Sequence, residues 1–553
     1  MVRLCSIQHA SIPETPGAHY NGSGLLGLHW EHMLKSHWTL LLICLGALVI
    51  RLALLGFIEH PGVGDPNHYY NLGRLLADGK GFTIDYIWQY NNPPDDLVHP
   101  EDYWMPLTSV FPAVAMSLFG QMVQVALLPF VLMGSLIPLV TYAAARQFDC
   151  TETTSLLVAG ASALLPEFVL NSLRTDTTVP NILLVCTSIL LLTRGLRRGE
   201  IWPFVGSGLA AGLAYLVRSD SSLLLPMLGV TVLAYALWGR TTVARPARWR
   251  YALLVPLLMI LLAAPWSLRN LQISGTLTTP KLDYMFYLTD FRDHWVYSTE
   301  LNLQTLLASQ TPAQLIGKRL FEMAASAKLL YTQLDVFLPV AVFGGLLLLL
   351  RARDREKWLT LAPALILLGG VFVFYTTLVP FKSEGGSFKK AYLTVIPLLL
   401  PLAGYALEKA VSDQRMRVGV MALAILFTGA NAVELVRADA RFAANYLNTM
   451  RGVAAQAQAL PDTNGDGEII LMAQDPFMLR FVGVRSVMIP MENRDVILEV
   501  AQRYGVDYIM LPPDRPSLDA VYNGTETDPR FVPVYDPTGR ALVFYGLDYS
   551  AGQ

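Results

Sequence analysis

The sequence predicts an α-helical polytopic membrane protein with about eleven transmembrane helices and a small extracytoplasmic α/β domain at its C-terminal end. Hydrophobic residues make up 53% of the 553 residues and charged residues 15%, against roughly 25% charged in ordinary soluble proteins. Apolar runs long enough to cross a bilayer recur along the chain, separated by short arginine clusters. So little charge cannot cover the surface of a soluble protein, which excludes that class.

Charge and cysteine content exclude further classes. The 41 basic and 43 acidic residues give a formal net charge of -2, which argues against a nucleic-acid partner. Four cysteines in a chain of this length encode neither a disulfide scaffold nor a cysteine-type zinc site.

The first apolar run follows a polar N-terminal tail of residues 1–37. It lies too far from the start, and is too long, to be a cleaved signal peptide. Arg51 lies near its distal end, where it either snorkels or meets a partner. The predicted spans are 38–58, 123–145, 153–172, 177–194, 201–218, 221–238, 250–268, 334–350, 358–379, 391–407 and 418–436.

Basic clusters orient these spans. Lysine and arginine are enriched on the cytoplasmic side of membrane proteins, so the clusters at Arg146, 194–198, 240–250, 351–357 and 408–417 are expected inside. The apolar run 105–119 is short and contains Pro106 and Pro112. If it spanned the bilayer, every later cluster would lie outside, so we interpret it as a re-entrant or interfacial helix. A multi-pass protein of the plasma (inner) membrane follows, with a cytoplasmic N-terminus and an extracytoplasmic C-terminus.

Three segments are then expected outside. They are loop 59–121, with eight acidic and two basic residues, loop 270–333, and the tail 437–553. The tail alternates helices with short apolar strands, which predicts a small α/β domain beside the membrane domain 38–436. Its expected elements are helices 443–460, 476–482 and 494–504, strands 468–473, 486–489 and 507–511, and a hairpin of 531–535 with 541–546.

Two acidic positions in the first loop are candidates for chemistry. Asp65 follows the first span directly and could act as a general base at the membrane surface. The alternative is that it N-caps a helix starting at Pro66. Farther along, residues 99–104 contain Glu101 and Asp102, which are metal-ligand types without the spacing of a known zinc or calcium loop. The alternative there is a solvated rim next to an interfacial tryptophan.

Charged residues also lie at the outer ends of later spans. Arg174 and Asp176 occupy a very short outer turn, which is either functional or simply soluble. Five cations depart from the positive-inside pattern, and a phosphate head group held at the bilayer surface would explain them. The alternative is snorkelling, or pairing with Asp220 or Glu384. The five cations are Arg218, Arg269, Lys382, Lys389 and Lys390.

Residues 462–468 match the start of a calcium-binding EF-hand loop, but loop position 12 is Ala473 rather than the required glutamate. We therefore expect a polar turn between a helix and a strand. Asn21 and Asn523 fit the glycosylation pattern weakly.

Taken together, these residues resemble the GT-C superfamily of membrane glycosyltransferases, and among them glycosyltransferase family 39, which contains protein O-mannosyltransferases, and the related lipid A aminoarabinose transferases. The resemblance covers about residues 38–436. It rests on Gly64-Asp65 with Tyr69-Tyr70 and residues 75–79, on residues 208–218, on Pro265-Trp266 with Arg269-Asn270 and Gly275, and on Lys390-Ala391-Tyr392 before an apolar helix.

The resemblance implies transfer of a sugar from a polyprenyl-phosphate donor to an acceptor hydroxyl outside the cytoplasm, with inversion. Asp65 would be the general base, Asp176 a second acid that orients the acceptor, and Arg218, Arg269 and Lys390 the partners of the donor phosphate. Pro66 stands where the family often has a second acid, so Glu101 or Asp102 would supply that charge. No cofactor or metal is implied, and the expected partners are the lipid-linked donor, an acceptor protein or glycolipid, and membrane lipid. Further substrate contacts are expected from His68, Tyr69, Arg174, Lys389 and Tyr392.

Two other classes make different predictions. A secondary transporter would have ionisable residues near helix midpoints and repeated halves, whereas the notable charges here lie at helix ends. A non-catalytic cell-envelope assembly protein would tolerate Asp65→Asn.

Overall fold

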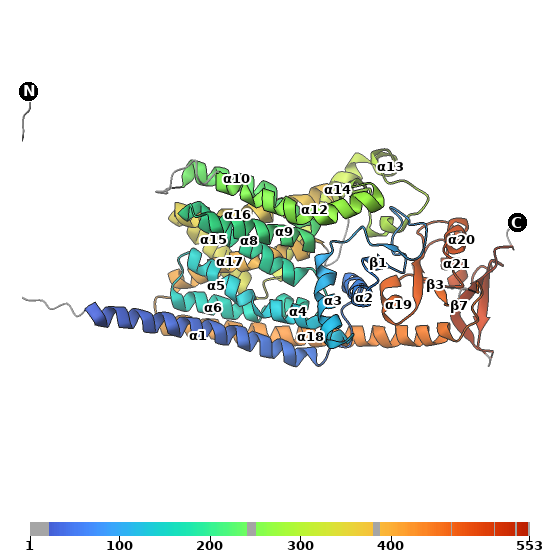
Figure 1. The fold of residues 1–553 in the computed structure, drawn as a ribbon, viewed down its shortest axis with the longest axis horizontal. Coiled ribbons are helices and arrows are strands. Elements are labelled where there is room, and N and C mark those ends of the chain that lie inside the picture. The colour runs from blue at the N-terminus through green and yellow to red at the C-terminus, as the bar shows by residue number, and fades with distance from the viewer. Residues whose placement is uncertain are drawn as a thin grey trace, which may run out of the picture.

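In the computed structural model most of the chain is a bundle of roughly parallel helices, with a small sheet domain beyond one end (Figure 1). The structure describes residues 22–239, 250–379, 387–465, 467–513, 515–536 and 539–550, with side chains from residue 37 onward. The basic segment 240–249, Lys382, Glu384 and the glycosylation candidate Asn21 lie outside the described residues.

The described residues contain eight helical segments long and apolar enough to cross a membrane, or nine if one bent pair is a single span, rather than the eleven predicted. The bent pair is α14 (Pro312–Thr332) and α15 (Phe337–Ala352), which meet at 102°. The eight segments are His37–Leu55 of α1 (Gly22–Leu55), Val123–Gln147 of α4 (Val123–Ser135) and α5 (Ile137–Gln147), α8 (Thr178–Arg198), Ser219–Trp238 with α10 (Leu224–Trp238), Arg250–Ser274 with α12 (Leu254–Ser274), Arg355–Leu378 with α16 (Arg355–Val373), α17 (Ser387–Ala410) and α18 (Gln414–Gln458).

Two predicted spans are shorter or broken. Predicted span 153–172 is divided into α6 (Glu152–Ala163) and α7 (Pro166–Asn171). Pro166 has no amide hydrogen to continue the helical ladder, so a new helix begins there. Predicted span 201–218 is α9 (Ile201–Val217), a 17-residue apolar helix.

The basic clusters within the described residues gather at one end of the bundle. Arg197, in the last turn of α8, donates to the Gln147 and Glu356 carbonyl oxygens, and Lys357 pairs with Asp149 at 3.3 Å. Asp176 directly precedes the first turn of α8, about 30 Å away for a helix of this length. The structure thus separates the arginine clusters from the candidate site along the bundle axis.

Arg51 does not snorkel. Its side chain is fully buried in α1 and donates to Ser172 Oγ at 3.0 Å and to the Ala163 carbonyl oxygen at 2.9 Å. These bonds tie α1 to the break between α6 and α7.

The first outer loop forms two helices at the end of the bundle. These are α2 (Asp65–Ala77) and α3 (Leu107–Phe119), with a two-residue antiparallel pair, β1 (Thr83–Ile84) and β2 (His99–Pro100), between them. Figure 1 shows α3 crossing the direction of the bundle helices, as expected of the interfacial helix predicted for residues 105–119. The second outer loop contains α13 (Leu303–Ser309) and leads into α14.

The C-terminal domain is built on an extension of α18. The span predicted to end at 436 and the helix predicted to begin at 443 are one continuous helix of 45 residues, which runs along the bundle and into the domain (Figure 1). A five-stranded sheet follows, in the order β4-β3-β5-β7-β6, with β4, β3 and β5 parallel. Its elements are β3 (Ile470–Ala473), α19 (Pro476–Phe481), β4 (Arg485–Met488), α20 (Arg494–Arg503), β5 (Tyr508–Met510), α21 (Asp519–Tyr522), β6 (Phe531–Tyr535) and β7 (Ala541–Leu547).

The first outer loop adds to the edge of this sheet. Ile87 pairs with Val487 of β4, donating to the Ser486 carbonyl oxygen at 3.0 Å and accepting from the Met488 amide at 2.8 Å. Ile87 and Tyr90 are buried in the apolar core of the C-terminal domain. Segments about 400 residues apart in the chain therefore form one outer unit.

Candidate active site

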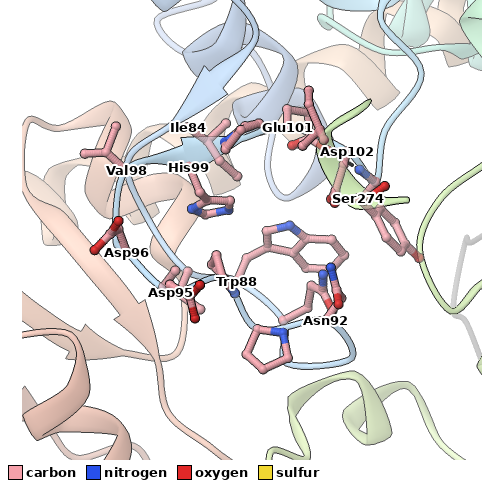
Figure 2. Close-up of a pocket in the computed structure, with 17 residues that line it drawn as sticks. Ile84, Trp88, Asn92, Asp95, Asp96, Val98, His99, Glu101, Asp102 and Ser274 are labelled. Atoms are coloured by element: carbon pink, nitrogen blue, oxygen red, sulfur yellow. Dashed lines mark hydrogen bonds between the residues drawn. The ribbon is translucent and has the colours of Figure 1, made fainter. Parts of the chain in front are cut away.

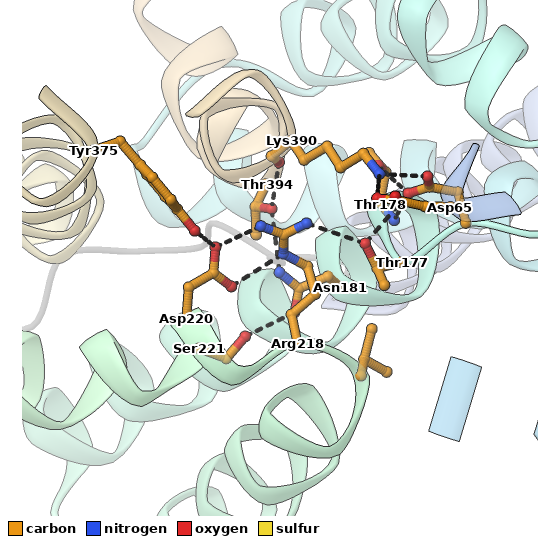
Figure 3. A network of polar contacts seen from close by, with 12 residues as sticks. Asp65, Thr177, Thr178, Asn181, Arg218, Asp220, Ser221, Tyr375, Lys390 and Thr394 are labelled. Carbon is orange, nitrogen blue, oxygen red and sulfur yellow. Dashed lines mark hydrogen bonds and ion pairs between the residues drawn. The ribbon is translucent and has the colours of Figure 1, made fainter. Parts of the chain in front are cut away.

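Three predicted site residues meet at the end of the bundle that carries α2 and α3. The Lys390 ammonium, near the start of α17, lies 3.0 Å from Asp65 Oδ2 and 2.7 Å from Asp176 Oδ2. Figure 3 shows the Lys390 side chain extending away from α17 toward Asp65. The structure thus brings together the two acids and one cation that the sequence placed at the same membrane face.

Asp65 does not cap α2. The residue before the helix is Gly64, at a φ of 73° that favours glycine, and no side chain caps this end. The N-cap alternative is therefore wrong. Asp65 turns one carboxylate oxygen to Lys390, and 41% of its side chain remains exposed, so the group is open to an incoming molecule.

Asp176 is the buried member of the pair. Its side chain is 3% exposed, and Oδ1 accepts from the Thr178 amide at 2.9 Å and the Thr178 hydroxyl at 2.7 Å. Burial opposes its ionisation, but the charge and hydrogen bond of Lys390, with the Thr178 bonds, hold its pKa well below the ordinary value. Because its oxygens are engaged, Asp176 fixes Lys390 rather than facing the solvent.

Arg218 joins the same network through α8. It forms two hydrogen bonds to Asp220, at 3.0 and 2.6 Å, and one to Thr177 Oγ1 at 3.1 Å. Tyr375 completes the arrangement by donating to Asp220 at 2.6 Å (Figure 3). The predicted alternative, pairing with Asp220, is thus confirmed for this arginine.

Two further predicted cations pair with acids outside this network. Lys389 lies 2.8 Å from Glu167 of α7, and Arg174 pairs with Asp439 of α18. Lys389 and Lys390 are adjacent in α17, and side chains of adjacent helical residues point about 100° apart. This divergence explains why one lysine enters the network and the other contacts α7.

Arg269 differs in its partners from Arg174, Arg218, Lys389 and Lys390. It donates to the carbonyl oxygens of Glu101 at 2.7 Å and Phe82 at 3.0 Å, and its guanidinium lies 4.4 Å from the Trp266 ring centroid. Among the described residues no carboxylate forms an ion pair with it. Neutral groups fix its position, and the carboxyl groups that act on its charge, Glu101 and Asp102, do so without a direct ion pair.

His68 and Glu101 form a buried pair beside α2. His68 Nε2 lies 3.3 Å from Glu101 Oε2, and both side chains are almost fully buried. Burial lowers the pKa of His68 to about 3 and raises the pKa of Glu101 to about 8. Both groups are therefore mainly neutral at pH 7, and the two facing atoms, His68 Nε2 and Glu101 Oε2, have no hydrogen-bond partner among the described residues.

This pair organises an aromatic cluster rather than a solvated rim. Glu101 Oε1 accepts from the Tyr103 amide at 2.7 Å and the Trp104 amide at 2.8 Å. Trp104 stacks on His68 and meets the edge of Tyr69 at 5.3 Å. The rim alternative is thus wrong for Glu101, whereas Asp102 stays half-buried at the border of a cavity.

Tyr392 lies outside the network. Its hydroxyl donates to the Leu330 carbonyl oxygen at 2.8 Å, and its ring is buried in the bundle. Sequence reasoning in turn missed Thr177, Thr178 and Tyr375 as network members. Tyr375 is a polar residue within a predicted span, which is only a weak sequence signal of function. The two threonines gave no such signal.

The C-terminal domain contacts the helix that carries Asp65. Asn71 of α2 donates to the Phe477 carbonyl oxygen at 3.0 Å, and Arg480 of α19 lies 2.7 Å from Asp85 in the first loop. Asp475 caps α19 through the Met478 amide at 3.0 Å. The short helix α19 is therefore fixed against α2.

The described residues contain no group of three or more histidine, cysteine, aspartate or glutamate side chains that could hold a metal ion. In the polar turn predicted at residues 462–468, Asp462 accepts backbone hydrogen bonds from Gly465 at 2.6 Å and Gly467 at 2.7 Å, while residue 466 lies outside the described part.

The fold is that of the GT-C membrane glycosyltransferases. Residues 98–267 match the family model described as dolichyl-phosphate-mannose-protein mannosyltransferase. No curated protein sequence matches the chain.

Three solved structures of two proteins share this fold across most of the chain. ArnT from Cupriavidus metallidurans in the apo state is similar at 16% sequence identity and a TM-score of 0.58, over 94% of this chain and 99% of that one. Its complex with undecaprenyl phosphate is similar at 16% identity and a TM-score of 0.57, over 93% of this chain and 98% of that one. The oligosaccharyltransferase of Archaeoglobus fulgidus in its apo form is similar at 13% sequence identity and a TM-score of 0.52, over 92% of this chain and 74% of that one. These similarities confirm the predicted resemblance and fold class. The matched family and both neighbours are glycosyltransferases, the class of enzyme that the sequence predicts.

Proposed function

We propose that this protein transfers a sugar from a polyprenyl-phosphate-linked donor to an acceptor hydroxyl at the extracytoplasmic face of the plasma (inner) membrane, inverting the anomeric carbon. The observation that carries the proposal is the bridge from Lys390 to Asp65 and Asp176, next to the network of Arg218. It combines an accessible carboxylate with cations at one end of an apolar bundle. The family description names a dolichyl-phosphate sugar, and one ArnT structure holds undecaprenyl phosphate, which supports a polyprenyl phosphate as the carrier here.

Asp65 is the general base of the proposed reaction. Its side chain is the more exposed of the two carboxylates bonded to Lys390. A carboxylate within hydrogen-bond reach of an acceptor hydroxyl takes up the proton as the oxygen attacks. Asp176 acts through Lys390, which it holds in place.

Arg269 is the first candidate for the donor phosphate. Lys389, Arg174 and Arg218 are each paired with a carboxylate, whereas Arg269 has none among the described residues. A guanidinium presents parallel donors to phosphate oxygens, and its stacking on Trp266 holds the plane of the group. Lys390 supplies the second positive charge, beside the base.

The reaction balances as a single displacement. The acceptor oxygen forms a bond to the anomeric carbon while the bond from that carbon to the phosphate oxygen breaks. The acceptor proton passes to Asp65, and the electron pair leaves with polyprenyl phosphate, whose charge Arg269 and Lys390 stabilise. The acceptor is a protein or a glycolipid, and the step uses no metal or cofactor.

Replacement of the base tests this proposal. In membranes containing the native acceptors, with a labelled undecaprenyl-phosphate hexose supplied, Asp65→Asn is expected to lower the release of undecaprenyl phosphate about 100-fold or more. Asp78→Asn is the matched control, because Asp78 lies just after the other end of α2 and contacts Gln121. Release by Asp65→Asn at the wild-type rate would refute the assignment, and thermal protection by undecaprenyl phosphate should persist in that variant.

A further inference from the structure

A cavity separate from the candidate active site lies in the first outer loop. It encloses about 490 Å³ between the loop that joins β1 to β2 and the C-terminal end of α12, a volume within the range of small-molecule sites. Figure 2 shows Trp88, His99 and Asn92 around the open space, with Asp95 and Asp96 at one side and Asp102 at the other.

Trp88 gives this cavity a fixed donor. The side chain is 7% exposed, held by Tyr103 at 4.9 Å and Phe477 at 5.7 Å between ring centroids. Its indole N–H has no hydrogen-bond partner among the described residues, and the ring borders the cavity (Figure 2). The N–H is not fully enclosed, so an acceptor atom of a molecule in the cavity can reach it.

The charged groups that line the cavity are carboxylates. Asp96, Asp102 and the Asn92 amide border the cavity, and no lysine or arginine does so among the described residues. His99 is bonded through Nδ1 to the Leu97 carbonyl oxygen at 3.1 Å, and burial lowers its pKa, so it is neutral at pH 7. An anionic ligand would be repelled by the carboxylates, whereas hydroxyl groups can both donate to them and accept from Trp88.

An aromatic wall separates this cavity from the candidate active site. Tyr103 contacts Trp88 at 4.9 Å and Trp104 at 5.6 Å, and Trp104 contacts Tyr69 at 5.3 Å. Tyr69 lies one helical turn after Asp65 in α2. A molecule in the cavity therefore lies beyond the reach of the base, on the same outer loop.

We propose that this cavity binds an uncharged, polyhydroxylated sugar unit, as a second contact for a glycan-bearing acceptor. An aromatic surface with carboxylate and amide acceptors around it matches the hydroxyl pattern and apolar face of a pyranose. Only the statement that the sugar belongs to the acceptor rests on the proposed transferase function. The binding of the sugar itself is independent of it.

A charge series of monosaccharides tests the cavity. With the full-length protein in detergent, saturation-transfer NMR would compare methyl α-glucoside, methyl α-mannoside and glucuronate. At least one of the neutral glycosides is expected to bind, and glucuronate at least tenfold more weakly. The double variant Asp96→Asn with Asp102→Asn should reduce the difference in affinity between glucuronate and the neutral glycosides. Equal binding of glucuronate and the glycosides, or no binding of any of the three, would overturn the proposal.

Two variants locate the bound sugar. Trp88→Phe keeps an aromatic ring and removes the unpaired N–H, so we expect at least fivefold weaker glycoside binding. Trp202→Phe is the control, since Trp202 is 77% exposed in the first turn of α9. Unchanged binding by Trp88→Phe would contradict the assignment. Asp65→Asn should bind the glycoside normally, so loss of sugar binding and failure of the transferase proposal give separate results.

Discussion

Glu101 forms a buried pair with His68 and makes the stability of the protein depend on pH. Replacement of Glu101 by glutamine should remove the part of this pH dependence that Glu101 contributes. In the folded protein burial raises the pKa of Glu101 from 4.5 to about 8. The unfolded chain ionises this carboxyl near 4.5, so between these two values the folded state holds one more proton. Stability from this group is therefore complete below pH 4.5 and is lost as the pH rises through about 8.

The magnitude follows from the size of the shift. One pKa unit corresponds to about 1.4 kcal/mol, so a rise from 4.5 to about 8 amounts to about 5 kcal/mol as an upper bound. His68 has the opposite sign, because burial lowers its pKa from 6.5 to about 3 and its contribution is lost as the pH falls between those values. Between pH 4.5 and 6.5 the stability contribution of Glu101 falls with pH while that of His68 rises, so the two oppose one another. The stability that the pair contributes therefore shows a net decline above pH 6.5.

Glutamine keeps the geometry and removes the titration. Its amide oxygen accepts from the Tyr103 and Trp104 amides, and its NH₂ takes the place of the carboxyl oxygen that faces His68. Thermal unfolding followed by tryptophan fluorescence from pH 5 to 9 should show Glu101→Gln gaining stability over the wild type up to about pH 8. Asp96→Asn, on the exposed part of the same loop, is the control. A constant difference between Glu101→Gln and the wild type at every pH would refute the reasoning.

Two further variants test contacts of the site. Arg269→Gln should raise the KM for the polyprenyl-phosphate donor about tenfold or more, since a charge-assisted contact to phosphate is lost. Arg269→Lys keeps the charge and should show a smaller rise in KM. An unchanged KM for Arg269→Gln would exclude this arginine from the phosphate site. Arg480→Gln leaves the nearly buried Asp85 unpaired, at a cost of about 3 kcal/mol, and should increase hydrogen exchange in α2. Addition of Asp85→Asn should recover most of that loss, whereas additive effects would show that the pair is not coupled.

The helices of the bundle were predictable where apolar runs end in charge. Predicted span 177–194 became α8 (Thr178–Arg198), because Asp176 precedes it and arginines follow. The same rule failed for α18. Charges between Glu434 and Arg441 indicated the end of a span, but the helix continues, since charged side chains on its solvated face do not interrupt the backbone ladder.

Pairings across the site were beyond the sequence. The outer location of Asp65, Asp176 and Lys390 followed from topology, yet the bridge joins residues 325 and 214 positions apart. Periodicity indicates that Lys389 and Lys390 diverge, but not which one meets the acids. The burial of Glu101 was hidden as well, because it depends on aromatic residues and on α19 from a distant part of the chain.

The arrangement of Lys390 couples the two halves of the proposed reaction. In the resting state its ammonium is shared between two carboxylates, Asp65 and Asp176, so little of its charge is available to an anion. When Asp65 takes the acceptor proton, that carboxylate becomes neutral, and Lys390 retains Asp176 as its single charged partner. Positive charge is thereby released beside the base as negative charge develops on the departing phosphate. Proton uptake at one carboxylate thus strengthens the hold on the leaving group, while Asp176 keeps the ammonium in place throughout the step.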